Sequence, residues 1–116
     1  MVADQDQFST PQERLSASEW LIMRICWRLG RCTVRDVLRE DLKTRTRDYR
    51  TILTFMTRMT KKGWLEVEKE GNTNYYTPSV PKKEALIEEV RRFLEDVVGP
   101  EPEDRELLNR VFSEPR

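Results

Sequence analysis

The sequence predicts a mainly α-helical fold with one small β-hairpin, and three observations lead to this prediction. Between residues 16 and 63, apolar side chains recur at helical spacing in three stretches with cap or stop signals. A stretch that alternates apolar and acidic residues follows, and a turn-forming segment separates it from a second short strand. A further apolar stripe at steps of three and four covers residues 86–98.

The first predicted helix begins after Ser16, because Ser16 and Glu19 have the spacing of a capping box, and it ends at Gly30. Thr33 is a good cap for a short second helix at about 34–42. The inner side of this helix is expected to carry Val34, Val37, Leu38 and Leu42. The polar residues 1–13 predict a flexible amino-terminal tail.

A third helix is predicted from about Arg47 to Lys62, with Gly63 as its stop signal. Residues 64–68 are predicted to form a half-buried strand, 71–74 a turn and 75–77 the returning strand. Three helices followed by a hairpin predict a winged helix-turn-helix domain over residues 14–80. Residues 81–116 are predicted to form a carboxy-terminal segment with helices at about 82–98 and 103–113.

The charge of the chain is balanced overall but is unevenly distributed. The 116 residues contain 21 Lys and Arg and 21 Asp and Glu. Residues 1–13 carry three acids and no base, residues 14–62 carry 13 bases against 5 acids, and residues 63–116 carry 8 bases against 13 acids. A basic block of this kind indicates an interaction with nucleic acid or a membrane surface.

The third helix concentrates this positive charge on one face. Ile52, Phe55, Met56 and Met59 fall within one wedge and predict the buried side. The opposite face and its flanks lack acids and combine the residue types that contact base edges and phosphates. The predicted DNA contacts of this helix are Arg47, Arg50, Thr51, Thr54, Thr57, Arg58 and Lys61. A solvated basic face is the alternative interpretation.

Residues of the hairpin and of the last segment complete the predicted interfaces. Asn72 and Asn74, with Lys69 and Thr73, are expected either to touch DNA or simply to form the turn. The apolar stripe of residues 86–98 is expected to pair with the same stripe of a second copy in a homodimer, or else to pack on the winged helix of its own chain. It consists of Leu86, Ile87, Val90, Phe93, Leu94, Val97 and Val98. A dimer predicts a palindromic operator in double-stranded DNA.

The stretch from Leu15 to Trp27 resembles the opening of penicillinase-repressor (BlaI/MecI/CopY) proteins, with Glu-Trp, Met and Trp at the family's spacing. The segments 51–65 and 76–78 are similar to that family's recognition helix and second wing strand. This resemblance implies a bacterial, cytoplasmic, homodimeric repressor. It supports DNA contacts at Arg50, Thr51, Thr54 and Arg58, whereas Leu53 departs from the basic residue that is frequent in the family.

The resemblance also implies a regulatory protease as a partner, because repressors of this family are inactivated by proteolysis in the carboxy-terminal segment. The chain has Asn109-Arg110-Val111-Phe112 there instead of an Asn-Phe bond, and it lacks the Cys-x-Cys elements of copper-responsive relatives. The inducer and the release mechanism therefore stay open.

The composition argues against an enzyme, a metal site or a cofactor. The chain has no His, two Cys and four scattered Gly, so it lacks imidazole-based catalytic groups, a four-Cys zinc site and a phosphate-binding glycine loop. No apolar run is long enough for a membrane span, which is consistent with a cytoplasmic protein. Cys26 is expected in the core, and Cys32 is expected either in an exposed turn as a redox-sensitive thiol or as an inert residue.

These observations predict a DNA-binding transcriptional repressor without enzymatic activity. The alternative is a winged-helix module that docks an acidic protein partner through the same basic face. The three tryptophans, Trp20, Trp27 and Trp64, are expected in the core, because each belongs to an apolar helix or strand pattern. The acidic residues of the dimerisation segment are expected to solvate its surface away from phosphates, or alternatively to form a patch that binds a partner; they are Glu84, Glu88, Glu89, Glu95 and Asp96.

Overall fold

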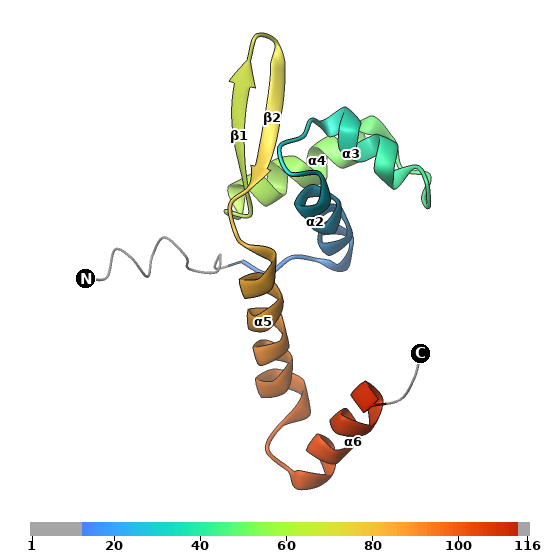
Figure 1. Ribbon diagram of the computed structural model, residues 1–116, viewed down its shortest axis with the longest axis vertical. Helices are drawn as coiled ribbons and strands as arrows, with labels where there is room; N and C mark the ends of the chain where they lie inside the picture. Colours follow the sequence, from blue (N-terminus) through green and yellow to red (C-terminus); the bar gives the residue numbers. More distant parts are fainter. Residues whose placement is uncertain (1–12, 114–116) are drawn as a thin grey trace, which may run out of the picture. The chain divides into compact units, whose positions relative to one another are not determined.

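A computed structural model describes residues 13–113 of the chain (Figure 1). The chain forms two compact units, with the boundary between Lys82 and Lys83. The first unit contains the helices α2 (Ala17–Leu29), α3 (Val34–Asp41) and α4 (Tyr49–Lys61) and the hairpin strands β1 (Leu65–Glu70) and β2 (Thr73–Pro78). The second unit contains most of α5 (Lys82–Phe93), the π-helical turn η1 (Leu94–Val98) and α6 (Pro102–Ser113). The predicted mainly helical, winged-helix fold is confirmed.

Local hydrogen bonds fix where the first two helices begin. Ser16 Oγ accepts from Glu19 N, while Glu19 Oε1 accepts from Ser16 N at 2.8 Å, so the predicted capping box is present. Thr33 and Asp36 form a second capping box at the start of α3. Such reciprocal bonds satisfy backbone donors that have no partner within a helix.

The core of the first unit lies where its three helices meet the base of the hairpin. Figure 1 shows the hairpin projecting from this group of helices. The wholly buried side chains come from every helix: Ile22, Met23 and Cys26 of α2, Val37 of α3, and Ile52, Met56 and Met59 of α4. Burial of an Ile or Met side chain contributes about 1.5–3 kcal/mol, so this cluster drives the docking of the amphipathic helices.

The tryptophans, predicted to lie in the core, form a second cluster in which Trp64 is buried and Trp20 and Trp27 are half-buried. The ring centres of Trp20 and Trp64 lie 5.5 Å apart, and that of Trp27 lies 6.0 Å from Trp20. Trp27 Nε1 donates to the carbonyl of Val80 at 2.8 Å, and Trp64 Nε1 donates to the carbonyl of Glu13 at 3.1 Å. Apart from Glu13, the predicted tail, 1–13, lies outside the described residues.

Three boundaries of the winged helix differ from the sequence-based prediction. Helix α4 begins at Tyr49 with Asp48 as its cap, so Arg47 precedes the helix. Leu42, predicted to face inward, is 52% exposed, because α3 ends one residue before it. The hairpin strands are longer than predicted and leave only Gly71 and Asn72 in the turn, since Glu70 pairs with Thr73.

Cys32 was expected in an exposed turn as one alternative, and the structure contradicts that placement. Its backbone N and O both bond to Tyr76 of β2, at 2.9 and 2.7 Å, and its side chain is 1% exposed. The turn after α2 therefore forms an antiparallel β-bridge with the edge of β2 that does not pair with β1. Cys26 is wholly buried, as predicted.

The second unit does not contain the continuous helix predicted over 82–98. Helix α5 ends at Phe93, and a π-helical turn at 94–98 follows, closed by Gly99 at a φ of 76°. Helix α6 then begins at Pro102 and lies against η1. Across the described part of the chain, no helix is both long and apolar enough to cross a bilayer.

Candidate nucleic-acid interface

Except for Arg47, the residues predicted for the outward face lie on α4. Ile52, Met56 and Met59 are wholly buried, which turns the opposite side of the helix to solvent. The exposed side chains on that side are Arg50, Thr54, Thr57, Arg58 and Lys61, and Thr51 is half-buried at its edge. This α4 face therefore presents three cations and three hydroxyl groups along three turns of one helix.

The cations of the α4 face differ from most other bases of the basic block, although Arg24 and Arg35 are likewise exposed and form no ion pair among the described residues. Arg28 and Lys43 pair with Glu40, Arg31 pairs with Glu70, and Arg39 pairs with Asp36. Among the described residues, Arg50, Arg58 and Lys61 form no ion pair within 4.0 Å. Much of the basic block thus serves the protein's own structure, while the α4 face keeps charge available for an anionic partner.

Lys62 belongs to the basic block, but its charge is used in a contact within the fold. Its Nζ lies 2.7 Å from Oε1 of the buried Glu19 and 3.1 Å from the carbonyl of Arg14. Burial by itself raises the pKa of Glu19, but the hydrogen bonds from Lys62 and from the Ser16 backbone outweigh it and lower the pKa overall. Lys62 therefore ties the end of α4 to the start of α2.

Asp48 fixes the start of the helix that carries the face. Its carboxylate accepts a hydrogen bond from Thr51 N at 2.9 Å. This bond holds the pKa of Asp48 below its usual value. A carboxylate at this position also interacts favourably with the positive end of the helix dipole. Sequence reasoning missed this cap, although an Asp just before an apolar helical pattern is a known start signal.

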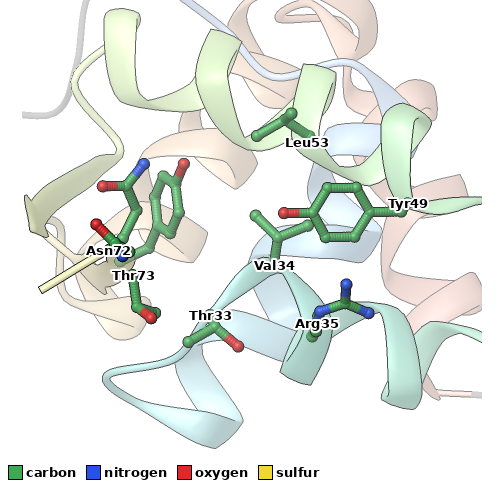
Figure 2. A pocket seen from close by; sticks show the side chains of 9 residues that line it. Thr33, Val34, Arg35, Tyr49, Leu53, Asn72 and Thr73 are labelled. Atoms are coloured by element: carbon green, nitrogen blue, oxygen red, sulfur yellow. The ribbon is translucent and has the colours of Figure 1, made fainter.

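The hairpin lies beside the α4 face and forms two hollows with it. The first has a volume of about 310 Å³ and lies between the beginnings of α3 and α4 and the hairpin turn (Figure 2). The second, of about 350 Å³, lies between the end of α4 and the middle of the hairpin. Asn74 lines both hollows, and Asn72 lines the first. The structure therefore brings the two predicted hairpin residues next to the α4 face.

Two residues of the first hollow were not found by sequence reasoning. The Arg35 guanidinium lies 5.2 Å from the centre of the Tyr49 ring, and both side chains are exposed. Figure 2 shows the Tyr49 hydroxyl pointing into the hollow, below Leu53. No local pattern marks these residues, because Arg35 and Tyr49 belong to different helices and meet only in the folded chain.

Tyr76 of β2 is buried and lines both hollows. Burial raises the pKa of its phenol above the usual value, and the neighbouring Tyr49 acts in the same direction. At the other side of β2, Arg31 stacks 3.9 Å from the centre of the Tyr75 ring and pairs with Glu70 at 2.7 Å. These contacts fix the hairpin against the turn between α2 and α3.

Arg47 is not on the α4 face where the sequence placed it. It lies before α4, and its side chain is 18% exposed. Its Nε is 4.0 Å from Oδ2 of the buried Asp41, and its guanidinium lies 5.4 Å from the centre of the Phe55 ring. The physical reason is that Asp48 caps the helix, so Arg47 belongs to the preceding turn and folds back toward the core.

The predicted dimer residues form an apolar surface within the second unit. Leu86, Ile87, Val90 and Phe93 are each between 42% and 49% exposed, and Val97 is 67% exposed. Leu94 and Val98 are half-buried. Phe93, Val97 and Val98 also line an apolar hollow of about 270 Å³ with Leu107, Leu108 and Val111 of α6. Within residues 13–113, much of this apolar surface stays exposed to solvent.

No cluster of three or more residues suited to hold a metal ion is found in residues 13–113. Residues 109–112, which lack the Asn-Phe bond of the family, lie within α6.

The chain is similar in sequence and in structure to several known proteins. Residues 15–110 match the family described as Penicillinase repressor. The chain is 40% identical over 87 residues to an uncharacterised 16.5 kDa protein of the ptsI 3′ region in Latilactobacillus sakei, covering 73% of this chain and 58% of that one. It is 31% identical over 81 residues to the penicillinase repressor of Bacillus licheniformis, covering 70% of this chain and 63% of that one. The chain thus spans about three fifths of the length of these relatives.

Among solved structures, one similar to this chain is the monomeric form of Bacillus licheniformis BlaI in complex with the blaP half-operator. The TM-score is 0.53 at 32% sequence identity, and the match covers 61% of this chain and 87% of the other.

Proposed function

Because this chain belongs to the penicillinase repressor family, we propose that it is a transcriptional repressor that binds double-stranded DNA in a sequence-dependent way. The family consists of repressors rather than enzymes, and the proposal assigns no catalytic activity or cofactor to the chain. The observation that carries the proposal is the α4 face, where Arg50, Arg58 and Lys61 are exposed without ion pairs among the described residues.

In this proposal, α4 enters the major groove. Arg50, Thr51, Thr54 and Thr57 face the bases, because Arg bonds guanine in a bidentate way and Thr offers a hydroxyl and a methyl group. Arg58 and Lys61, nearer the end of the helix, bind phosphates, which supply affinity without sequence information. Asn72 and Asn74 lie across the two hollows from α4 and reach the adjacent backbone. The similar BlaI structure, which contains a half-operator, supports this use of the fold.

The proposal includes a homodimer on a palindromic operator. Exposing the apolar residues of α5 and η1 to water is unfavourable, and pairing them with a second copy removes them from water. A two-fold dimer presents two α4 helices, about 34–36 Å apart if both enter the major groove on one side of the DNA. Repression then follows from occupancy of the promoter. Such a repressor acts where the promoter DNA is, so we place it in the bacterial cytoplasm, consistent with its bacterial relatives.

Selection from a random duplex pool tests the proposal. We expect the wild-type chain to recover an inverted repeat, and to bind it more tightly than a scrambled duplex at several salt concentrations. The logarithm of affinity should fall linearly with the logarithm of salt, with a slope of about −0.9 for each neutralised phosphate. Binding without salt dependence, or with no preference between the two duplexes, would contradict the proposal and favour a protein partner for the basic face.

A further inference from the structure

Asp41 carries a buried carboxylate that the proposed DNA contacts do not use. It is wholly buried at the end of α3. Its Oδ1 lies 3.7 Å from Arg45 Nη1, and its Oδ2 lies 4.0 Å from Arg47 Nε. Within residues 13–113 neither oxygen accepts a hydrogen bond, and Arg47 Nη1 is also buried without one. Removing charge from water is costly unless the charges are paired and hydrogen-bonded, so this loose pair adds little to stability.

The same residue organises the turn that leads into α4. The backbone carbonyl of Asp41 accepts hydrogen bonds from Thr44 N at 3.1 Å and Arg45 N at 2.9 Å. Its carboxylate lies 4.0 Å from Arg47 Nε, and the Phe55 ring of α4 has its centre 5.4 Å from the same guanidinium. Because α4 begins two residues after Arg47, this contact sets the position of the first turn of α4 relative to α3.

Asp41 also limits the positive charge near the start of the α4 face. The side chains of Arg45 and Arg47 are 34% and 18% exposed, and Asp41 is the acid within 4.0 Å of both among the described residues. Without this carboxylate, two guanidinium groups would stand uncompensated beside the first turn of α4. They would attract phosphates of any DNA sequence, because phosphate attraction carries no base information.

We propose that Asp41 is a positioning residue that determines specificity: through Arg47 it orients the start of α4, and by neutralising Arg47 it limits binding to non-specific DNA. The inference rests on the proposed function and assigns Arg47 to the support of α4 rather than to a base contact. It predicts opposite changes in two affinities, whereas a residue needed only for folding would weaken both together.

The test compares wild type and Asp41→Asn on the duplex selected with the wild-type chain and on a scrambled duplex of the same composition. Asn has nearly the shape of Asp, removes its charge and replaces one carboxylate oxygen by an amide NH2 group. We expect weaker binding to the selected duplex and tighter binding to the scrambled one. The specificity ratio is the dissociation constant for the scrambled duplex divided by that for the selected duplex. This ratio should fall by about tenfold, within the range of one lost base contact. The salt slope on the scrambled duplex should steepen by about one phosphate contact.

Glu40→Gln is the matched control. Glu40 precedes Asp41 on α3 and pairs with the exposed Arg28 and Lys43, so its substitution removes the same charge away from α4. We expect this variant to change both affinities alike and to leave their ratio unchanged. Combining Asp41→Asn with Arg47→Gln restores the net charge, so binding to the scrambled duplex should return to the wild-type level while specific binding stays weak.

Two outcomes would overturn the inference: an unchanged ratio in a folded Asp41→Asn variant, or an equal fall of the ratio in Glu40→Gln. If Asp41→Asn lowers the melting temperature so far that it is unfolded, Arg47→Lys replaces it as the deciding variant. Lys keeps the charge but loses the planar group that contacts Asp41 and Phe55, so specific binding alone should weaken. Unchanged specific binding in Arg47→Lys would overturn the inference. Failure of the wild-type chain to prefer its selected duplex would instead defeat the proposed function.

Discussion

Individual residues of the α4 face have different expected roles because of where they lie along the helix. Arg50 and Thr54 lie in its first two turns, where an inserted helix meets the base edges. Arg58 and Lys61 lie in its last turn. An exposed cation there reaches phosphates without depending on the sequence of the DNA.

Substitutions of these residues should therefore separate into two classes. Arg50→Ala or Thr54→Ala should relax base preference at one operator position, with a cost of about 1–3 kcal/mol on the selected duplex. Arg58→Ala or Lys61→Ala should weaken binding to all duplexes and reduce the salt slope by about 1. Binding measured against single-base variants of the operator and over a salt series distinguishes the classes. A uniform loss for all four variants would contradict the assignment.

Glu19 gives a prediction on stability and pH. Its pKa in the folded chain is lowered, so the carboxylate stabilises the fold at pH values above its usual pKa, and this contribution is lost as the pH falls through the lowered value. Glu19→Gln should reduce the free energy of unfolding at pH 7 by about 1–3 kcal/mol, because Lys62 loses its buried partner. Denaturant unfolding at pH 7 and at pH 2 measures this difference.

The control for Glu19 is Glu66→Gln, which changes an exposed carboxylate of β1. Its stability should stay close to that of the wild type at both pH values. A loss in Glu19→Gln that persists unchanged at pH 2 would mean that packing, rather than the charge, is the source of the effect.

At the scale of elements, the hairpin depends on a turn of only two residues. Gly71 has a φ of 62°, whereas no other residue type in the described part of the chain has a positive φ. A two-residue turn with glycine in its first position matches the right-handed twist of paired strands. The length of the strands on both sides of this turn determines how far Asn72 and Asn74 extend beside α4.

Gly71→Ala should therefore destabilise the hairpin by about 1–2 kcal/mol, since a Cβ disfavours positive φ although the space around it is open. Thermal unfolding checks the size of the effect, and Asn72→Ala serves as the control because Asn72 has no positive φ. Equal melting temperatures for Gly71→Ala and the wild type would show that the strands can adopt another turn.

At the scale of the whole molecule, the total charge is zero because a basic first unit is balanced by an acidic second unit. The basic block lies in the first unit, and three of its cations that form no ion pair among the described residues lie on the α4 face. The second unit carries an excess of acids and the exposed apolar residues of α5, η1 and α6. We expect this division to let the first unit attract DNA while the second joins two copies.

Phe93→Asp tests the proposed dimer, because a charge within an apolar interface is unfavourable. Sedimentation should give a dimer for the wild type and a monomer for the variant, and the monomer should bind the inverted repeat more weakly. Lys83→Asp, an exposed change on the same helix and outside the stripe, should remain a dimer. A dimeric Phe93→Asp would remove the stripe from the interface.

The sequence by itself determined the features that depend on neighbours along the chain. The caps at Ser16 and Thr33 and the buried side of α4 arise from contacts three or four residues apart, so the pattern of residues reveals them. The tertiary structure decided which polar groups meet across elements. Lys62 pairs with Glu19, the backbone of Cys32 bonds to that of Tyr76, and Arg47 turns to Asp41 rather than outward. These partners are brought together only by packing, and packing also decides which cations keep their charge available for DNA.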